Sequence, residues 1–143
     1  MAKRPAKKLT EQDIQEWNGP ESEYMNAAQL AFFREKLLQM QEEIIHKATN
    51  TADYLQDQEA TPDPADRATL EEEYSLELRT RDRERKLLSK VQASLRQIDE
   101  GDYGYCQDTG EPIGLKRLLI RPTATLSVEA QERREQMKKQ FAG

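Results

Sequence analysis

Between two long segments of helical pattern, the chain reads Thr61-Pro62-Asp63-Pro64-Ala65-Asp66-Arg67-Ala68. Proline is favoured at the first position of a helix, and an aspartate before it can cap the free N–H groups of the first turn. Asp63 is therefore expected as the N-cap, Pro64 as the first helical residue, and Asp66 near the positive end of the helix dipole. The pattern predicts an antiparallel helical hairpin whose acidic tip lies near residues 56–66. Carboxylates at the end of a rigid rod favour a protein that acts on a partner.

On both sides of the tip, apolar residues recur at intervals of three and four, which is typical of a coiled-coil seam. Asn26 and Gln29 resemble a capping box, so the first helix is expected over about 27–55, and the second over about 63–99. The seam positions of the first helix are Leu30, Phe33, Leu37, Met40, Ile44, Ala48 and Thr51. Those of the second helix are Tyr74, Leu78, Leu88, Val91, Leu95 and Ile98.

The amino-acid composition limits the architectures that the chain can adopt. Charged residues make up 34% of the chain and hydrophobic residues 36%, which favours elongated helices over a large spherical core. No apolar run approaches the roughly 20 residues that span a bilayer, and the basic residues 1–8 lack the apolar stretch of a secretory signal. A single cysteine, Cys106, excludes an intrachain disulfide framework. We expect a cytoplasmic protein with no membrane segment.

Charge is segregated along the chain. Residues 52–73 contain eight acids and one base, whereas residues 79–90 contain six bases and two acids. Duplex DNA binding needs cations that face phosphates, so the acidic tip argues against it. The tip instead suits a basic or metal-bearing cavity in a partner. The alternative is that both blocks are solvated helix faces.

The remainder of the chain is expected to form two further parts. Residues 1–25 show little periodicity and predict a flexible or loosely docked arm, residues 26–100 form the hairpin, and residues 101–143 form a small head. Gly101 and Gly104 end the second helix, and Gly, Pro and apolar residues then predict tight turns with a minimal β-hairpin around 111–113. Ser127 is expected as the N-cap of a short C-terminal helix.

The head has the spacing of a zinc finger without its ligands. The ligand positions of two C-x-x-C pairs separated by 17 residues are occupied here by Cys106, Thr109, Ser127 and Ala130. One thiolate and two hydroxyls cannot hold a tetrahedral structural zinc, so no zinc is expected. The predicted fold is thus dominated by α-helix, with a long antiparallel coiled-coil hairpin projecting from a head built on a degenerate zinc finger and a C-terminal helix. The head core is expected to comprise Tyr105, Ile113, Leu115, Leu118, Leu119, Leu126 and Val128.

The tip sequence, the basic shaft after it and the finger spacing occur in one order that closely resembles the DksA family of transcription factors. The matching stretches include Glu71-Glu72-Glu73-Tyr74-Ser75-Leu76-Glu77-Leu78-Arg79, Gly104-Tyr105-Cys106 and Arg121-Pro122-Thr123-Ala124. The likeness runs from about residue 24 to the C-terminus and is to the cysteine-poor, zinc-free members. It implies a monomeric regulator of bacterial RNA polymerase that inserts its hairpin into the secondary channel and alters open-complex stability. It also implies no specific binding to DNA and no enzymatic activity.

The same resemblance implies site residues. The tip motif D-x-x-D-x-A falls on Asp63, Asp66 and Ala68, and polymerase contacts of the shaft fall on Arg79 and Arg83. Contacts to the alarmone ppGpp, which acts with the family in the stringent response, fall on Leu87, Lys90 and Arg121. A further basic position of that site is Gln131 here, so a weaker response to ppGpp is expected.

Other functions stay open at this point. A Gre-like transcript-cleavage factor also places acids at the end of a coiled coil, where they hold a second metal for RNA cleavage. For the tip itself, Asp63 and Asp66 make a good helix start without any further role. A metal-dependent hydrolase is disfavoured, because the chain has one histidine, His46, and no Gly-rich phosphate loop. A coiled-coil adaptor is the least specific alternative.

Overall fold

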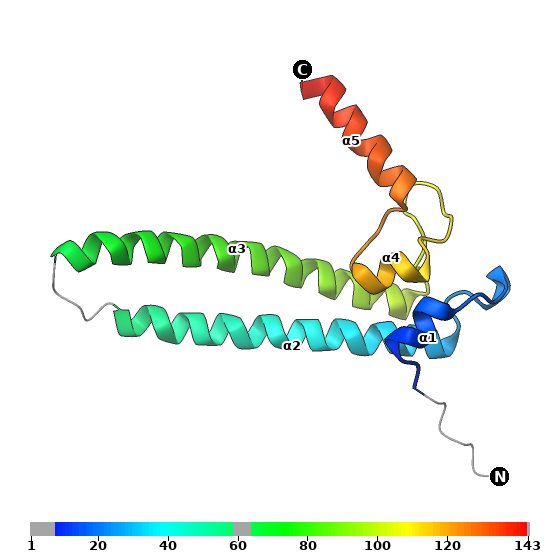
Figure 1. Ribbon diagram of the computed structural model, residues 1–143, viewed down its shortest axis with the longest axis horizontal. Coiled ribbons are helices and arrows are strands. Elements are labelled where there is room, and N and C mark those ends of the chain that lie inside the picture. Colours follow the sequence, from blue (N-terminus) through cyan, green and yellow to red (C-terminus); the bar gives the residue numbers. More distant parts are fainter. Residues whose placement is uncertain (1–7, 59–63, 143) are drawn as a thin grey trace, which may run out of the picture. The chain divides into compact units, whose positions relative to one another are not determined.

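The computed structural model describes residues 8–58 and 64–142, with side chains for all of these except 51–58, 64–66 and 142. In this part of the chain the helical elements are α1 (Glu11–Glu16), the 3-10 helix η1 (Glu21–Glu23), α2 (Ala27–Gln58), α3 (Pro64–Glu100), α4 (Leu115–Ile120) and α5 (Val128–Ala142) (Figure 1). No strand occurs among these residues, and Tyr105 and Pro112 form an isolated antiparallel bridge where a minimal β-hairpin was expected. No helix of the described chain combines the length and apolar character needed to cross a lipid bilayer.

The helix-dominated fold with a hairpin and a small head is confirmed. The chain packs as two compact units, one made of Met1–Leu37 with Ala93–Gly143 and the other of Leu38–Gln92. We refer to them as the head unit and the shaft unit. The division of the sequence into 1–25, 26–100 and 101–143 stays a prediction.

In the head unit, an aromatic pair forms the centre of the core. Tyr103 and Phe33 are 1% and 0% exposed, with ring centroids 5.8 Å apart. The Tyr103 hydroxyl donates to the carbonyl of Pro122 at 2.8 Å, and burial raises the pKa of Tyr103, so the hydroxyl keeps its proton. Leu37 and Leu118 are also fully buried. Five of the expected head residues are buried, namely Ile113, Leu115, Leu118, Leu119 and Leu126.

Two of the expected head-core residues are not buried. Tyr105 is 38% exposed and Val128 47% exposed. The Tyr105 ring covers Tyr24 edge-on, with centroids 5.6 Å apart, rather than entering the core. Tyr103, two residues earlier, is buried in the core where Tyr105 was expected. Because side chains in an irregular loop have no fixed period, sequence spacing could not distinguish the two tyrosines.

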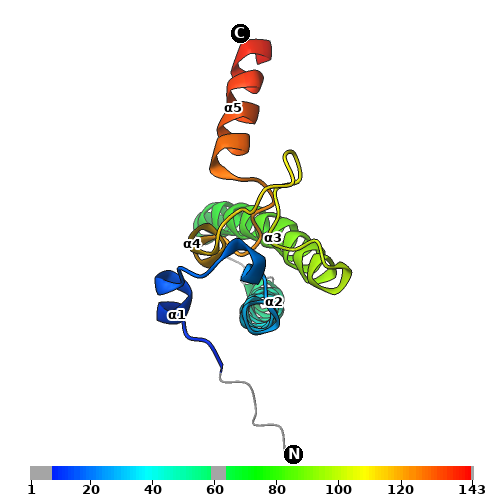
Figure 2. The same cartoon turned by 90° about the vertical axis from the view of Figure 1, so that its right-hand side faces the viewer.

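The expectation of a flexible or loosely docked arm is wrong for residues 8–25. Thr10 and Asp13 form a capping box that starts α1, and Ile14 is 1% exposed where α1 lies against α4 (Figure 2). The Tyr24 hydroxyl donates to the carbonyl of Gly104 at 2.7 Å and accepts from the N–H of Gly114 at 2.9 Å. These contacts lock the arm onto the loops of the head.

The junction of arm and α2 is tightly packed. Met25 has a left-handed backbone with φ 57°, and a Cβ added at Gly104 would lie 2.8 Å from the Met25 sulfur. The expected cap is present in altered form: Asn26 accepts from the N–H of Gln29, but the Gln29 side chain accepts from the N–H of Met25. The buried Gln29 side chain therefore stabilises the left-handed turn as well as the helix start.

In the shaft unit, α2 and α3 lie side by side and antiparallel (Figure 1). Of the expected seam residues, Ile44 and Val91 are buried, and Met40, Ala48 and Leu88 are half-buried. Tyr74 and Leu78 are 43% and 45% exposed, so the predicted seam loses its burial toward the tip. The side chain of Thr51 lies outside the described residues.

Candidate functional site

The helix that follows the predicted tip begins at the residue that the sequence indicated. Helix α3 starts at Pro64, as the proline position predicts. Asp66 belongs to its first turn, and Arg67 and Ala68 are exposed. Asp63 and the side chain of Asp66 lie outside the described residues, so their roles at the tip stay predictions. An aspartate in the first turn adds negative charge where the helix dipole favours it.

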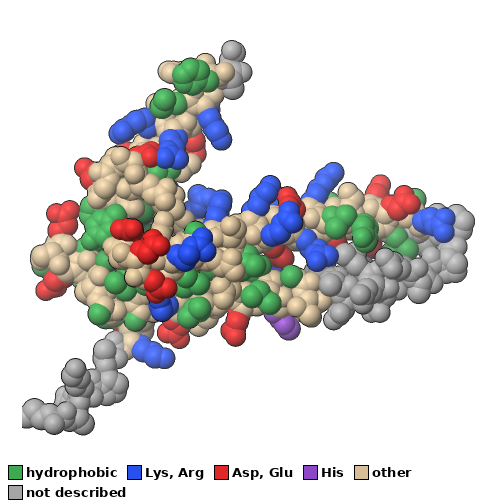
Figure 3. Space-filling model, turned by 180° about the vertical axis from the view of Figure 1, so that it is seen from behind, with side chains coloured by type: hydrophobic (Ala, Val, Ile, Leu, Met, Phe, Trp, Pro, Cys, Tyr) green, Lys and Arg blue, Asp and Glu red, His purple; other side chains and the backbone are tan. Residues whose placement is uncertain are grey.

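The shaft carries cations of two kinds. Arg85 and Lys86 both bind Asp82, at 2.7 and 3.3 Å, and the bonds from Lys86 and Arg85 lower the pKa of that carboxyl. Arg79 and Arg83 lie one turn apart on α3, are exposed, and form no ion pair with a residue that the structure describes. Lys and Arg side chains gather over α3 in the space-filling view (Figure 3). Arg79 and Arg83 are therefore available to a partner.

The three predicted ppGpp contacts and the further position of that site, Gln131, fall in both units. Leu87 is half-buried and Lys90 exposed on α3 of the shaft unit. Arg121 is exposed at the C-cap of α4 in the head unit, and Gln131 is half-buried on α5, where its amide donates to Glu135. Whether these residues meet in one site stays a prediction.

The degenerate zinc site keeps both turns of the finger with one of its four thiols. Cys106 is 2% exposed, and its carbonyl accepts from the N–H of Gly110 at 2.8 Å, which closes the first turn. Ser127 caps α5 as predicted, because its hydroxyl accepts from the N–H of Ala130 at 3.2 Å. Ser127 and Ala130 are both buried. The two turns thus fold on backbone and hydroxyl hydrogen bonds.

The sulfur of Cys106 lies among hydrogen-bond donors. Burial raises the pKa of the thiol, but bonds from the Thr109 hydroxyl and from the N–H groups of Ser127, Thr109 and Asp108 lower it to about 6. These donors favour the thiolate, which is the form that would also bind a metal. Across the described residues, no cluster of three or more His, Cys, Asp or Glu side chains could hold a metal ion.

One contact of the head joins residues that no sequence pattern links. The guanidinium of Arg134 on α5 binds both carboxylate oxygens of Asp108, with Nε 2.8 Å from Oδ2. The bond from Arg134 lowers the pKa of Asp108. This bidentate pair joins the first turn of the finger to the C-terminal helix, a link that zinc makes in a four-ligand finger. The two residues are 26 positions apart, so no local pattern could reveal the pair.

Comparisons with known proteins cover nearly the whole described chain. Residues 29–98 match the family model described as DnaK suppressor protein DksA, N-terminal domain, and residues 101–136 match the prokaryotic dksA/traR C4-type zinc finger. The second match covers a segment in which Cys106 is the single cysteine, with Thr109, Ser127 and Ala130 at the other ligand positions.

Individual relatives and a solved structure match the same family as these two models. The protein named RNA polymerase-binding transcription factor DksA from Caulobacter vibrioides is 56% identical over 78% of this chain and 80% of its own length. The protein of that name from Escherichia coli is 46% identical over 87% of this chain and 83% of its own. The structure of transcription factor DksA2 from Pseudomonas aeruginosa matches with a TM-score of 0.81 and 43% identity, covering 90% of this chain and 98% of the other. These matches give no support to the Gre-like alternative, and the chain belongs to the DksA family.

Proposed function

We propose that this chain is a bacterial transcription regulator that binds RNA polymerase through its helical hairpin and alters the stability of open promoter complexes. The observation that carries the proposal is its identity of 56% to a protein named RNA polymerase-binding transcription factor DksA, over 113 residues. The start of α3 at Pro64 supports it, because the tip motif then begins a long helix. The hairpin would enter the secondary channel of the polymerase with Asp63, Asp66 and Ala68 at its leading end.

The charges suit this role. Carboxylates delivered near a catalytic centre change the field at its metal ions and nucleotides, where low dielectric strengthens charge interactions. Arg79 and Arg83, exposed on α3 behind the tip, would contact the rim of the channel. We propose that the chain acts as a monomer, reads no DNA sequence and catalyses no reaction of its own.

We also propose that ppGpp enhances the effect, in the stringent response, through Leu87, Lys90 and Arg121 together with polymerase. Lysine and arginine suit the pyrophosphate groups, and the arginine fork can bind two oxygens of one phosphate. Arg121 is exposed, as such a contact requires. Gln131 supplies an amide where a cation would add charge, so the response is weaker than with a lysine there.

We further propose that the head works without zinc. Its two turns rest on the Cys106, Ser127 and Thr109 hydrogen bonds and on the Asp108–Arg134 pair. Three of the four ligand positions lack a thiol, and neutral hydroxyls bind zinc poorly. A head of this kind keeps its fold when zinc is scarce.

The tip is tested by Asp66→Asn, which keeps the size of the side chain and removes its charge. With purified polymerase at a ribosomal RNA promoter, the parent chain should shorten the open-complex half-life, and the variant should leave it near the value without factor. Its affinity for polymerase should change by no more than about threefold, which is under 1 kcal/mol. Glu72→Gln, an equivalent change at an exposed acid of α3, is the control and should act like the parent. Equal shortening by Asp66→Asn and the parent would refute the role of Asp66.

The ppGpp site is tested in the same assay with and without ppGpp. Arg121→Ala should abolish the additional shortening that ppGpp produces, because a phosphate contact is lost, while the effect without ppGpp persists. Gln131→Lys should deepen the ppGpp effect. Lys116→Ala removes an exposed cation of α4 and is the matched control. An unchanged ppGpp response in Arg121→Ala would contradict the assignment.

The metal-free head is tested by thermal unfolding with a chelator. The melting temperature of the purified chain should not change when EDTA is added. The triple variant Thr109→Cys, Ser127→Cys, Ala130→Cys restores four thiols and should gain a melting temperature that rises with zinc and falls with EDTA. A drop in the melting temperature of the parent chain on chelation would show that the head depends on metal.

The Cys106 thiolate predicts a pH dependence of stability. Its pKa of about 6 in the folded chain lies below the value of about 8.5 for an unfolded thiol. Folding therefore favours the thiolate, and this stabilisation is complete above about pH 8.5 and is lost as the pH falls to about 6. The melting temperature of the parent chain should rise over this range more than that of Cys106→Ser, whose hydroxyl does not titrate. Parallel curves for the two chains would place the thiol pKa near its ordinary value.

A further inference from the structure

Burial is distributed very unevenly along the hairpin. Among the described side chains of the shaft unit, residues 38–50 and 67–92, only Ile44 and Val91 are buried. From Arg67 to Lys90, a stretch of more than six helical turns of α3, no side chain is buried. Its apolar residues are partly solvated instead, with Leu76 60% exposed and Leu78 45% exposed. We call residues 67–90 of α3, together with residues 45–50 of α2, the outer shaft.

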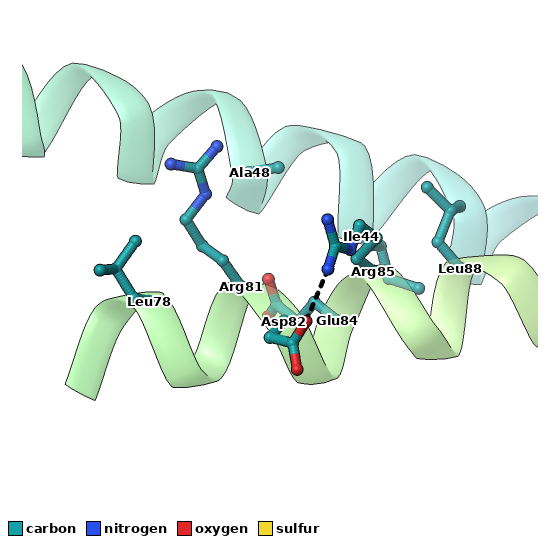
Figure 4. A pocket seen from close by; sticks show the side chains of 8 residues that line it. All are labelled: Ile44, Ala48, Leu78, Arg81, Asp82, Glu84, Arg85 and Leu88. Atoms are coloured by element: carbon teal, nitrogen blue, oxygen red, sulfur yellow. Dashed lines mark hydrogen bonds and ion pairs between the residues drawn. The ribbon is translucent and has the colours of Figure 1, made fainter. Parts of the chain in front are cut away.

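A cavity of about 410 Å³ interrupts the seam of the outer shaft. Arg81 and Arg85 occupy the heptad-like positions between Leu78 and Leu88, where a coiled coil places apolar side chains. Figure 4 shows Arg81 reaching from α3 toward Ala48 of α2. The lining residues are Ile44, Ala48, Leu78, Arg81, Asp82, Glu84, Arg85 and Leu88.

The residues around this cavity contribute little to holding α3 against α2. Arg81 is half-buried and makes no ion pair with any described residue, and Ala48 is too small to fill the space opposite it. The pairs of Asp82 with Arg85 and Lys86 lie within α3 and are largely exposed, so they support the helix weakly and do not bind it to α2.

Helices in water depend on tertiary packing. Most of the stability of a protein helix comes from burial of an apolar face, and segments with few buried contacts open at free energies well below that of global unfolding. In the head unit, Phe33, Leu37, Tyr103 and Leu118 provide such burial. The outer shaft has no equivalent.

We propose that the outer shaft opens and closes locally while the head unit stays folded, and that a partner covering the hairpin completes its packing. The first half of this proposal, the local opening, is inferred from the burial pattern and the cavity of the free chain. The second half rests on the proposed function, with RNA polymerase as that partner. A shaft of this kind can adapt its shape to a narrow channel, and it loses part of its conformational entropy only on binding.

The experiment is hydrogen exchange of the full chain, followed by mass spectrometry. The exchange rates of the two ends of one continuous helix, α3, are compared, so both regions have the same secondary structure. Peptides within 67–88 should exchange on the order of a hundredfold faster than peptides within 93–100, after correction for intrinsic rates. Equal protection in the two regions would overturn the proposal.

Two variants then test whether the seam defect is the cause. Arg81→Leu places an apolar side chain in the cavity and should slow exchange of 67–88 by roughly tenfold, about what one partly buried leucine supplies. Arg67→Leu makes the same chemical change in the same region of α3, at an exposed residue that does not line the cavity, and should have little effect. Equal slowing by both variants, or by neither, would refute the cavity as the origin of the opening.

Adding purified polymerase separates the two halves of the proposal. Strong slowing of 67–88 in the complex supports completion of the packing by the partner. If polymerase co-sediments with the chain but leaves 67–88 as fast as before, the second half is wrong. If polymerase does not bind, the proposed function fails, and the exchange pattern of the free chain still decides the first half.

Discussion

The ring of Tyr103 against Phe33, with its hydroxyl on the carbonyl of Pro122, is the interaction on which the head unit depends. It joins three segments that are far apart in sequence: the start of α2, the loop after α3 and the turn after α4. A buried tyrosine is stable only when its hydroxyl has a partner, so the Pro122 carbonyl is as important as the ring contact. Tyr24 is held in a similar way, because its hydroxyl forms hydrogen bonds with the backbone of Gly104 and Gly114.

A chain with so little apolar material must concentrate its burial. Nearly all fully buried side chains that the structure describes belong to the head unit, and the shaft unit retains Ile44 and Val91. A rod with the proposed role of entering another protein cannot carry a wide apolar face without risking aggregation, so a charged surface and a thin seam suit that role. Low local stability follows from that surface chemistry.

The head keeps the two turns of a four-ligand finger with one of its four thiols. Zinc holds four ligands of two turns at one point, whereas here the Cys106 sulfur gathers N–H and O–H donors from both turns. Arg134 adds a second link between the same two regions through Asp108. Each of these bonds is weaker than a zinc–sulfur bond, and none of them involves a metal ion.

Much of this architecture could be predicted from the chain alone, because it is encoded locally. The start of α3 at Pro64, the cap at Ser127 and the seam residues Phe33, Leu37 and Ile44 follow from capping chemistry and helical period. The family follows from motifs kept in order along the sequence. The candidate tip residues follow from the D-x-x-D-x-A motif of that family and stay predictions, because their contacts involve a second protein.

Tertiary structure decided the rest, because those features depend on residues without a fixed spacing. The docking of residues 8–25 rests on Tyr24, which bonds a glycine 80 positions away. The choice of Tyr103 over Tyr105 for the core, and the Asp108–Arg134 pair, depend on how irregular loops fold back on helices. The place where the seam stops being buried depends on which side chains of α2 face Arg81, and periodicity marks a face without showing how well it is filled.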